Sequence, residues 1–221
     1  TRPVSGSWYL LPGRDEGDPL EEEDIRRERV RLLLKRYGIL FRELLERELP
    51  PMRWSVLFRT LRVMELSGEL VTGHFFHGIG GLQFMSPAAF RALTRGLDHD
   101  RIYWINAADP ASLCGTGVEG LDPSLPSRHA TSFIVFHGMK PVVILRRGGR
   151  DVTVLVRPDH PLLDEYLCVF RDLLNRDFNP PSRISIESMN GVKPAVSEFR
   201  QAFISSGFVD DYSALSIRRR Y

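Results

Sequence analysis

The stretch of residues 36–85 restricts the possible folds of this chain more than any other part. Its pattern predicts helix, short turn, helix, and then two strands joined by a glycine-rich loop. The second helix of the pair, residues 52–66, carries apolar residues at the i, i+3, i+4 and i+7 spacing of a stripe that faces a core. That stripe consists of Trp54, Leu57, Phe58, Leu61 and Met64. This order is typical of a winged helix-turn-helix, a unit that commonly grips a nucleic-acid duplex.

Start and stop residues place further elements on both sides of this stretch. The expected helices cover residues 21–37, 40–48, 52–66, 86–94, 161–175 and 196–206. The expected strands cover residues 69–76, 82–85, 102–106, 132–138, 141–147, 151–156, 183–188 and 214–219. The pattern changes at residues 96–100, so we predict a winged-helix domain over 22–95 and an α+β domain over 100–221 with a meander of antiparallel strands.

Composition is that of an ordinary globular protein, with 221 residues, 43% hydrophobic and 26% charged. No run of 18 apolar residues or signal peptide is visible, so we expect no membrane partner and a cytoplasmic location. Cys114 and Cys168 are expected to be reduced thiols there. Residues 1–21 are expected to be a linker or N-terminal extension, because residues 13–24 are acidic and rich in turn formers. Because the chain starts on Thr1, we expect it to be a segment of a longer protein.

Arginine side chains are the main candidates for nucleic-acid contact. Arginines dominate residues 26–62 and recur at 146–150 and 218–220, although only three of the 30 basic residues are lysines. A GC-rich genome would also favour arginine, and charged helix faces are often merely solvated. The candidate contacts are Arg53, Ser55, Arg59 and Arg62 on the second helix, His74, His77 and Gln83 in the wing, and Arg146, Arg147 and Arg150 beside a Gly-Gly turn. Gln83 could instead cap a turn.

The sequence offers little support for bound metal or nucleotide. His74 and His77 could form a metal pair, but zinc needs three or four ligands and only the distant Cys114 or His137 could join them. The chain has no phosphate-binding loop, dinucleotide fingerprint or nucleophile elbow. We therefore expect neither a metal nor a cofactor in this chain, and no ATPase motor.

Three segments in fixed order resemble the C-terminal part of the bacterial large helicase-related proteins (Lhr), over roughly residues 28–157. They are RYGILFRELLERE, RVMELSGELVTGHFFHGIGGLQFMSPAAFRAL and WINAADPASLCGTG. The resemblance implies a parent DNA-repair helicase of superfamily 2, whose upstream ATPase motor would use ATP and Mg. It also implies similarity to the winged-helix and β-barrel architecture of AlkZ-like DNA glycosylases. Residues 100–221 would then be a β-barrel-like domain with peripheral helices.

Three functions are compatible with this resemblance. The first is a DNA-binding module that contacts single-stranded or duplex DNA and the upstream domains of the helicase. The second is a DNA glycosylase for uracil or alkylated bases, which needs a carboxylate such as Asp109, Asp210 or Asp211. Asp109 could merely cap a turn, and Asp210 and Asp211 are expected in a turn. The Q-x-D or Q-x-Q motif of AlkZ-like enzymes is absent, because Gln83 is followed by Phe84 and Met85.

The third function is an oligomerisation scaffold, since apolar strands can pair between copies of the chain. A self-contained transcription regulator is disfavoured, because no ligand-binding domain is recognisable.

Overall fold

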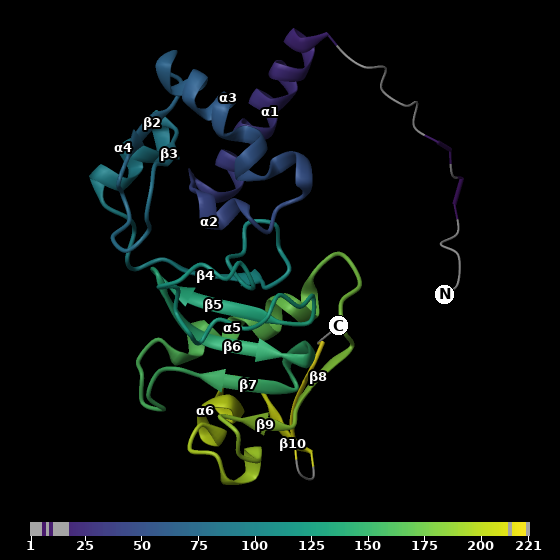
Figure 1. The fold of residues 1–221 in the computed structure, drawn as a ribbon. Coiled ribbons are helices and arrows are strands. Elements are labelled where there is room, and N and C mark those ends of the chain that lie inside the picture. The colour runs from purple at the N-terminus through teal and green to yellow at the C-terminus, as the bar shows by residue number, and fades with distance from the viewer. Residues whose placement is uncertain (1–5, 8, 11–17, 212–213, 220–221) are drawn as a thin grey trace.

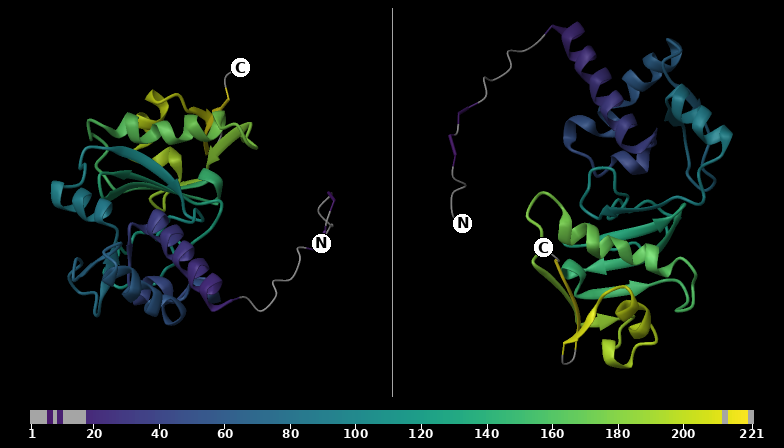
Figure 2. Two further views of the ribbon diagram at one scale, coloured as in Figure 1. Left: turned by 90° about the horizontal axis from the view of Figure 1, so that it is seen from above. Right: turned by 180° about the vertical axis from the view of Figure 1, so that it is seen from behind.

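The structure, a computed structural model, describes residues 6–7, 9–10, 18–211 and 214–219 of the chain. It is an α+β protein with two stacked halves (Figure 1). The N-terminal half consists of helices around a small sheet, and the C-terminal half consists of two sheets with helices beside them (Figures 1 and 2).

The N-terminal half contains the elements that the helix-turn-helix pattern predicts. Its helices are α1 (Pro19–Tyr37), α2 (Arg42–Leu45), the 3-10 turn η1 (Pro50–Met52), α3 (Trp54–Leu66) and α4 (Pro87–Arg95). The side chain of Asp18 caps α1 by accepting a hydrogen bond from the backbone of Leu20. Residues 19–21, which we expected in the linker, are therefore helical, and residues 1–5, 8 and 11–17 lie outside the described residues.

The expected helix over residues 40–48 is only partly present. Ile39–Leu40 form strand β1, which pairs with Phe84 and Met85 and leaves only the short α2 behind it. Strands β2 (Val71–Gly73) and β3 (Gln83–Met85) complete a sheet in the order β1-β3-β2. A pairing with a distant strand thus overrides the local helical pattern.

The C-terminal half has two open sheets in place of the expected β-barrel. Five strands lie in the order β4 (Ile102–Asn106), β5 (Phe133–His137), β6 (Lys140–Arg146), β7 (Asp151–Val154) and β9 (Ser188–Met189). Three more lie in the order β10 (Val209–Asp211), β11 (Ala214–Arg218) and β8 (Arg183–Ile186). A barrel requires its first and last strands to pair, but among the described strands β4 pairs only with β5 and does not meet β9 at the other end of the sheet.

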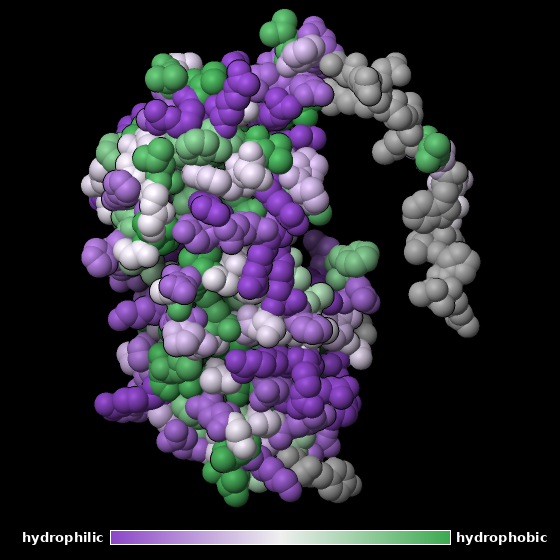
Figure 3. Space-filling model, in the orientation of Figure 1, coloured by the Kyte–Doolittle hydropathy of each residue, from purple (hydrophilic) through white to green (hydrophobic). Residues whose placement is uncertain are grey.

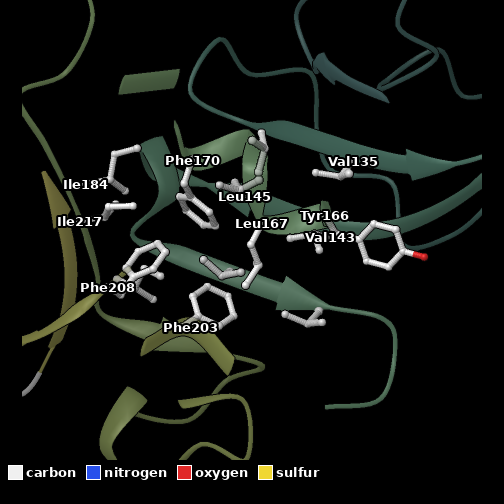
Figure 4. Close-up of a cluster of buried hydrophobic side chains, with 14 of the residues drawn as sticks. Val135, Val143, Leu145, Tyr166, Leu167, Phe170, Ile184, Phe203, Phe208 and Ile217 are labelled. Carbon is white, nitrogen blue, oxygen red and sulfur yellow. The ribbon is translucent and has the colours of Figure 1, made fainter. Parts of the chain in front are cut away.

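Helix α5 (Leu163–Asn175) covers one face of the five-stranded sheet (Figure 2, right). Its buried face contributes Tyr166, Leu167 and Phe170 to the largest core of the protein, which also includes side chains from both sheets and from α6 (Arg200–Ser205) (Figure 4). Helix α6 is shorter than the expected 196–206, because the chain first forms the 3-10 turn η3 (Pro194–Val196). A third such turn, η2 (Arg147–Gly149), joins β6 to β7.

The opposite face, which we call the outer face, is partly covered by the long connection of residues 107–131. Ala107 and Cys114 from this connection pack with Ile134 and Ile144 of the sheet. Val118 from the same connection packs against the core of the N-terminal half, and the guanidinium of Arg47 donates a hydrogen bond to the carbonyl oxygen of Gly115. This connection therefore attaches the two halves to each other.

Both cysteines, Cys114 and Cys168, are free. Among the described helices, none is long and apolar enough to cross a membrane.

Candidate nucleic-acid interface

Helix α3 presents two different faces. Its inner face buries Leu57, Leu61 and Met64 in the core of the N-terminal half, as its apolar spacing predicts. Phe58, which we expected in the core, is 38% exposed and packs edge-on against Phe84. It lies on the flank of the helix, where the apolar stripe meets solvent.

The solvent-exposed side of α3 carries fewer available cations than the sequence suggests. Arg59 and Ser55 are exposed, and Arg59 makes no hydrogen bond or ion pair with another described residue. The guanidinium of Arg62 is paired with Glu65 on the same helix. Arg53 precedes the helix and donates to the carbonyl oxygen of Glu48 at 3.3 Å. Arg59 is therefore the predicted α3 cation that is most available to a phosphate.

Apolar side chains lie on both sides of Arg59. Val56 and Val63 are 40% and 37% exposed, and Leu66 at the end of the helix is 80% exposed. Residues three and four positions apart are neighbours on a helix surface, so these side chains and Arg59 share one stripe. The solvent-exposed side of α3 can thus offer the positive charge of Arg59 together with apolar contacts.

Gln83 has a structural role in the wing. Its side chain is fully buried and its Oε1 accepts hydrogen bonds from the backbone N–H groups of Phe75 and Phe76, at 3.0 and 2.9 Å. Its Nε2 donates to the carbonyl oxygens of Phe76 and Ile79, both at 3.2 Å. These four hydrogen bonds engage the Gln83 amide with the backbone of the wing, so contact between Gln83 and nucleic acid stays a prediction that this conformation does not favour.

The two wing histidines, His74 and His77, are exposed at the surface. Within the described part of the chain, no group of three histidine, cysteine or acidic residues could hold a metal ion. The tip of the wing faces the C-terminal half, because Gly78 and Ile79 line a cavity of about 330 Å³ together with the 116–119 segment. His74 and His77 are thus the exposed polar side chains of the wing that can meet a ligand, and Phe76 between them is 46% exposed.

The arginines after β6 lie at one end of the outer face, where hydrophilic side chains gather at the right-hand ends of β6 and β7 in Figure 3. Arg147 and Arg150 both approach the carboxylate of Glu187, at 3.3 and 3.6 Å. Arg146 donates to the hydroxyl of Thr153 at 2.9 Å. Glu187 thus partly neutralises the two exposed cations of this group.

Each of the predicted catalytic carboxylates already has a partner. Asp109 Oδ1 accepts a hydrogen bond from the backbone of Ala111 at 2.8 Å and so caps the turn that follows it. Asp210 is paired with Arg200, and Asp211 with Arg183. Contrary to our expectation of a turn, these two aspartates belong to strand β10.

A carboxylate that the sequence analysis missed lines a surface cavity of about 370 Å³ between α5, α6 and β11. Asp164 Oδ1 accepts a hydrogen bond from the Ser206 hydroxyl at 2.6 Å and lies 3.7 Å from the Arg171 guanidinium. The amide of Asn175 lines the same cavity. No local motif could reveal this group, because Asp164 and Ser206 are 42 residues apart and only the tertiary fold brings them together.

Comparison with known proteins also finds a winged-helix domain in the N-terminal half. Residues 19–104 match the family model of the winged-helix domain of the large helicase-related protein. Over 216 residues the chain is 27% identical to the "Lhr helicase/uracil glycosylase" of Escherichia coli (strain K12), a match that covers 92% of this chain and 14% of that relative. The chain therefore spans about a seventh of the length of the relative it matches.

Proposed function

We propose that this chain, which is related to the C-terminal region of the large helicase-related proteins, is a DNA-binding module that works beside the motor domains of a longer helicase. The observation that carries the proposal is the exposed Arg59 on α3 of a winged helix that matches the Lhr family. In winged helices this element enters the major groove. Arg59 would contact a phosphate, and Ser55 on the same face of α3 would lie close enough to meet the DNA.

The wing would add contacts at the neighbouring backbone. His74 and His77 are exposed and carry hydrogen-bonding nitrogens. Arg146, Arg147 and Arg150 lie in the other half of the molecule and are partly neutralised, so we assign them a lesser share of the binding energy. ATP and Mg would belong to the motor of the longer protein.

The test is the salt dependence of duplex binding. Fluorescence anisotropy with a labelled duplex should give weaker binding by Arg59→Ala, and the slope of log K against log salt should fall by about one unit because one phosphate contact is lost. Arg157→Ala is the matched control, since Arg157 is an exposed arginine that pairs with Asp159 far from α3. An Arg59→Ala protein with the affinity and slope of the wild type would exclude this contact.

A second candidate function is removal of uracil from DNA. The E. coli relative is named as a helicase and uracil glycosylase, and the match covers 92% of this chain. Such an enzyme needs a carboxylate beside an extruded base. Asp164 lines a cavity with a hydrogen-bonding amide, so we add it to the sequence candidates Asp109 and Asp211.

The activity can be measured with an oligonucleotide that contains one uracil, followed by heating in alkali, which cleaves an abasic site. Asp109→Asn, Asp211→Asn and Asp164→Asn should be compared, with DNA binding measured in the same samples. Loss of cleavage with retained binding in one variant would identify the carboxylate. No cleavage by the wild-type chain would reject glycosylase activity for this segment.

The apolar neighbours of Arg59 favour a third role, in which α3 docks onto another protein surface. This role covers both the upstream domains of the helicase and a second copy of the chain. Light scattering after size-exclusion chromatography would reveal a homo-oligomer, and Val63→Asp should dissociate it if α3 forms the interface. A chain that stays monomeric at high concentration would leave only the upstream domains as a partner.

A further inference from the structure

We propose that the outer face of the five-stranded sheet binds an unpaired base of single-stranded DNA, with Tyr103 stacked on Phe136 as the platform. This inference deepens the proposed DNA-binding function and rests on it. It names the form of the DNA that the C-terminal half would recognise, whereas α3 would contact the duplex.

The two rings form a well-defined stack. Tyr103 of β4 and Phe136 of β5 are directly opposite each other in the antiparallel register. Their centroids are 5.3 Å apart and their planes differ by 15°, which is an offset stacked pair. Phe136 supports one side of the Tyr103 ring and keeps it in place.

The Tyr103 ring is accessible although it is supported. It is 42% exposed, and β4 is the end strand of its sheet, so no further strand covers it. By strand alternation Tyr103 lies on the face opposite α5, because Ile102 and Trp104 pack on the α5 side. A supported aromatic ring with a free surface is the usual platform for an unpaired base, since every base can stack on it.

Other exposed apolar side chains lie on the same sheet beyond the platform. Leu155, which follows β7, is 43% exposed, and Met139 at the tip of the β5–β6 hairpin is 60% exposed. In Figure 3, apolar side chains lie over the left-hand ends of β6 and β7. They would offer apolar surface to nucleotides farther along the strand.

The charges around the platform suit a phosphate backbone. Arg101 lies two residues before Tyr103 and so on the same side of the strand, and its positive charge acts on the Tyr103 hydroxyl. Arg101 is exposed and forms no ion pair with another described residue. Lys140 lies on the other face of the sheet, because it is opposite His137, whose ring contacts Tyr166 of α5. A base stacked on Tyr103 would thus have one unpaired cation within reach of a flanking phosphate.

An added protein strand is the alternative occupant, because β4 has a free edge. A peptide strand would bind through the backbone of β4 and would not require an aromatic ring at residue 103. The presence of a supported ring and an unpaired arginine on the same face favours single-stranded DNA.

The experiment compares a labelled oligo-dT with a labelled duplex of the same length, using the full chain and fluorescence anisotropy. Tyr103→Leu should weaken binding of oligo-dT about 5- to 100-fold, the range that loss of one stacked base gives. Tyr103→Phe should keep near wild-type affinity, because the ring remains. Phe178→Leu is the matched control, since Phe178 is 86% exposed and lies elsewhere on the surface. Thermal melting would verify that Tyr103→Leu folds.

A second measurement locates the base directly. Photocrosslinking of an oligonucleotide with one 5-iodouracil, followed by mass spectrometry, should place the crosslink on Tyr103 or its neighbours on β4 and β5. Wild-type affinity of Tyr103→Leu for oligo-dT, or crosslinks confined to other surfaces, would overturn the proposal. Failure of duplex binding through Arg59 would leave these results unaffected, so the two proposals can be rejected separately.

Discussion

At the scale of the residue, Gln83 shows how a polar side chain can be fixed by backbone groups alone. Replacing Gln83 with Ala would leave the partly buried N–H groups of Phe75 and Phe76 without an acceptor. We expect the free energy of unfolding to fall by about 2–3 kcal/mol, the cost of such unpaired groups. Urea denaturation would measure this, with Gln201→Ala at an exposed position of α6 as control. Equal stability of the two variants would contradict the role we assign to Gln83.

Tyr37 gives a prediction that depends on pH. Its hydroxyl donates to Glu48 Oε1 at 2.5 Å, and the Arg36 guanidinium donates to the same oxygen at 3.0 Å. Burial, and then the hydrogen bond to Glu48, raise the pKa of Tyr37 above its ordinary value. The folded state therefore holds the phenolic proton more tightly, and this contribution is present below the ordinary pKa and is lost as pH rises through the higher folded value.

We expect Tyr37→Phe to lower the free energy of unfolding by about 1–2 kcal/mol at neutral pH, because a hydrogen bond to a carboxylate is lost. The difference between wild type and Tyr37→Phe should shrink as pH rises above about 10, the ordinary tyrosine value. Urea denaturation across that range would test it, with the exposed Tyr9→Phe as control. A difference that stays constant with pH would show that the hydroxyl contributes nothing through its proton.

Single residues also show where sequence patterns carry information about a site. Arg59 is exposed as predicted, because helical spacing separates it from the apolar stripe. Arg62 has the same spacing but is paired with Glu65, and Asp210 and Asp211 are paired with arginines that lie far from them in the sequence. A pattern gives the face on which a charge lies, but its partners, on the same element or on another, decide whether that charge is available.

At the scale of the element, α3 combines a core face and a surface face within 13 residues. Leu61 is fully buried and Leu66 is 80% exposed. Leu61→Ala should lower the free energy of unfolding by about 2–5 kcal/mol, since it leaves a cavity, whereas Leu66→Ala should change it by less than about 0.5 kcal/mol. Chemical denaturation of both variants would test this assignment. Similar losses at both positions would mean that α3 is packed on both faces.

Elements with strong local signals were predicted best. The strand over residues 102–106 has the expected bounds, and the helix expected over 161–175 ends at Asn175 as predicted but begins two residues later, at Leu163. Their patterns are long or bounded by turn residues. The expected helix over residues 40–48 was predicted only in part, since residues 42–45 are helical while Ile39 and Leu40 pair with β3. Local spacing contains no information about a partner strand more than 40 residues away.

At the scale of the whole molecule, the junction between the halves depends on a close approach at Gly138. Its φ is +58°, and a Cβ atom there would lie 2.5 Å from the carbonyl oxygen of His99. Gly138→Ala should therefore cost more than Gly120→Ala, where φ is +82° but no atom lies within 4 Å. We expect about 1–2 kcal/mol for Gly120→Ala from the backbone conformation alone and a larger loss for Gly138→Ala, measured by denaturation. Equal losses of unfolding free energy in the two variants would show that the backbone around His99 can move to accept a Cβ atom at residue 138.

The sequence predicted the strands of the C-terminal half but not whether their sheets close. The run of antiparallel strands was predicted correctly from their β-branched residues, whereas the barrel that the resemblance implied was wrong. Whether a sheet closes depends on which strands stand at its ends, and that depends on contacts such as the parallel pairing of β7 with β9. Those contacts join segments separated by a whole helix and leave no periodic signal in the sequence.

The connection of residues 107–131 attaches the half that carries α3 to the half that carries Tyr103, through Val118 and the hydrogen bond from Arg47 to Gly115. Arg59 on α3 and the Tyr103 platform would then be two weak DNA-binding sites at a fixed separation. A DNA molecule that reaches both would bind the second site at a high effective concentration. A duplex that continues into a single strand should then bind tighter than either form alone, but only when its unpaired part is long enough to span the distance.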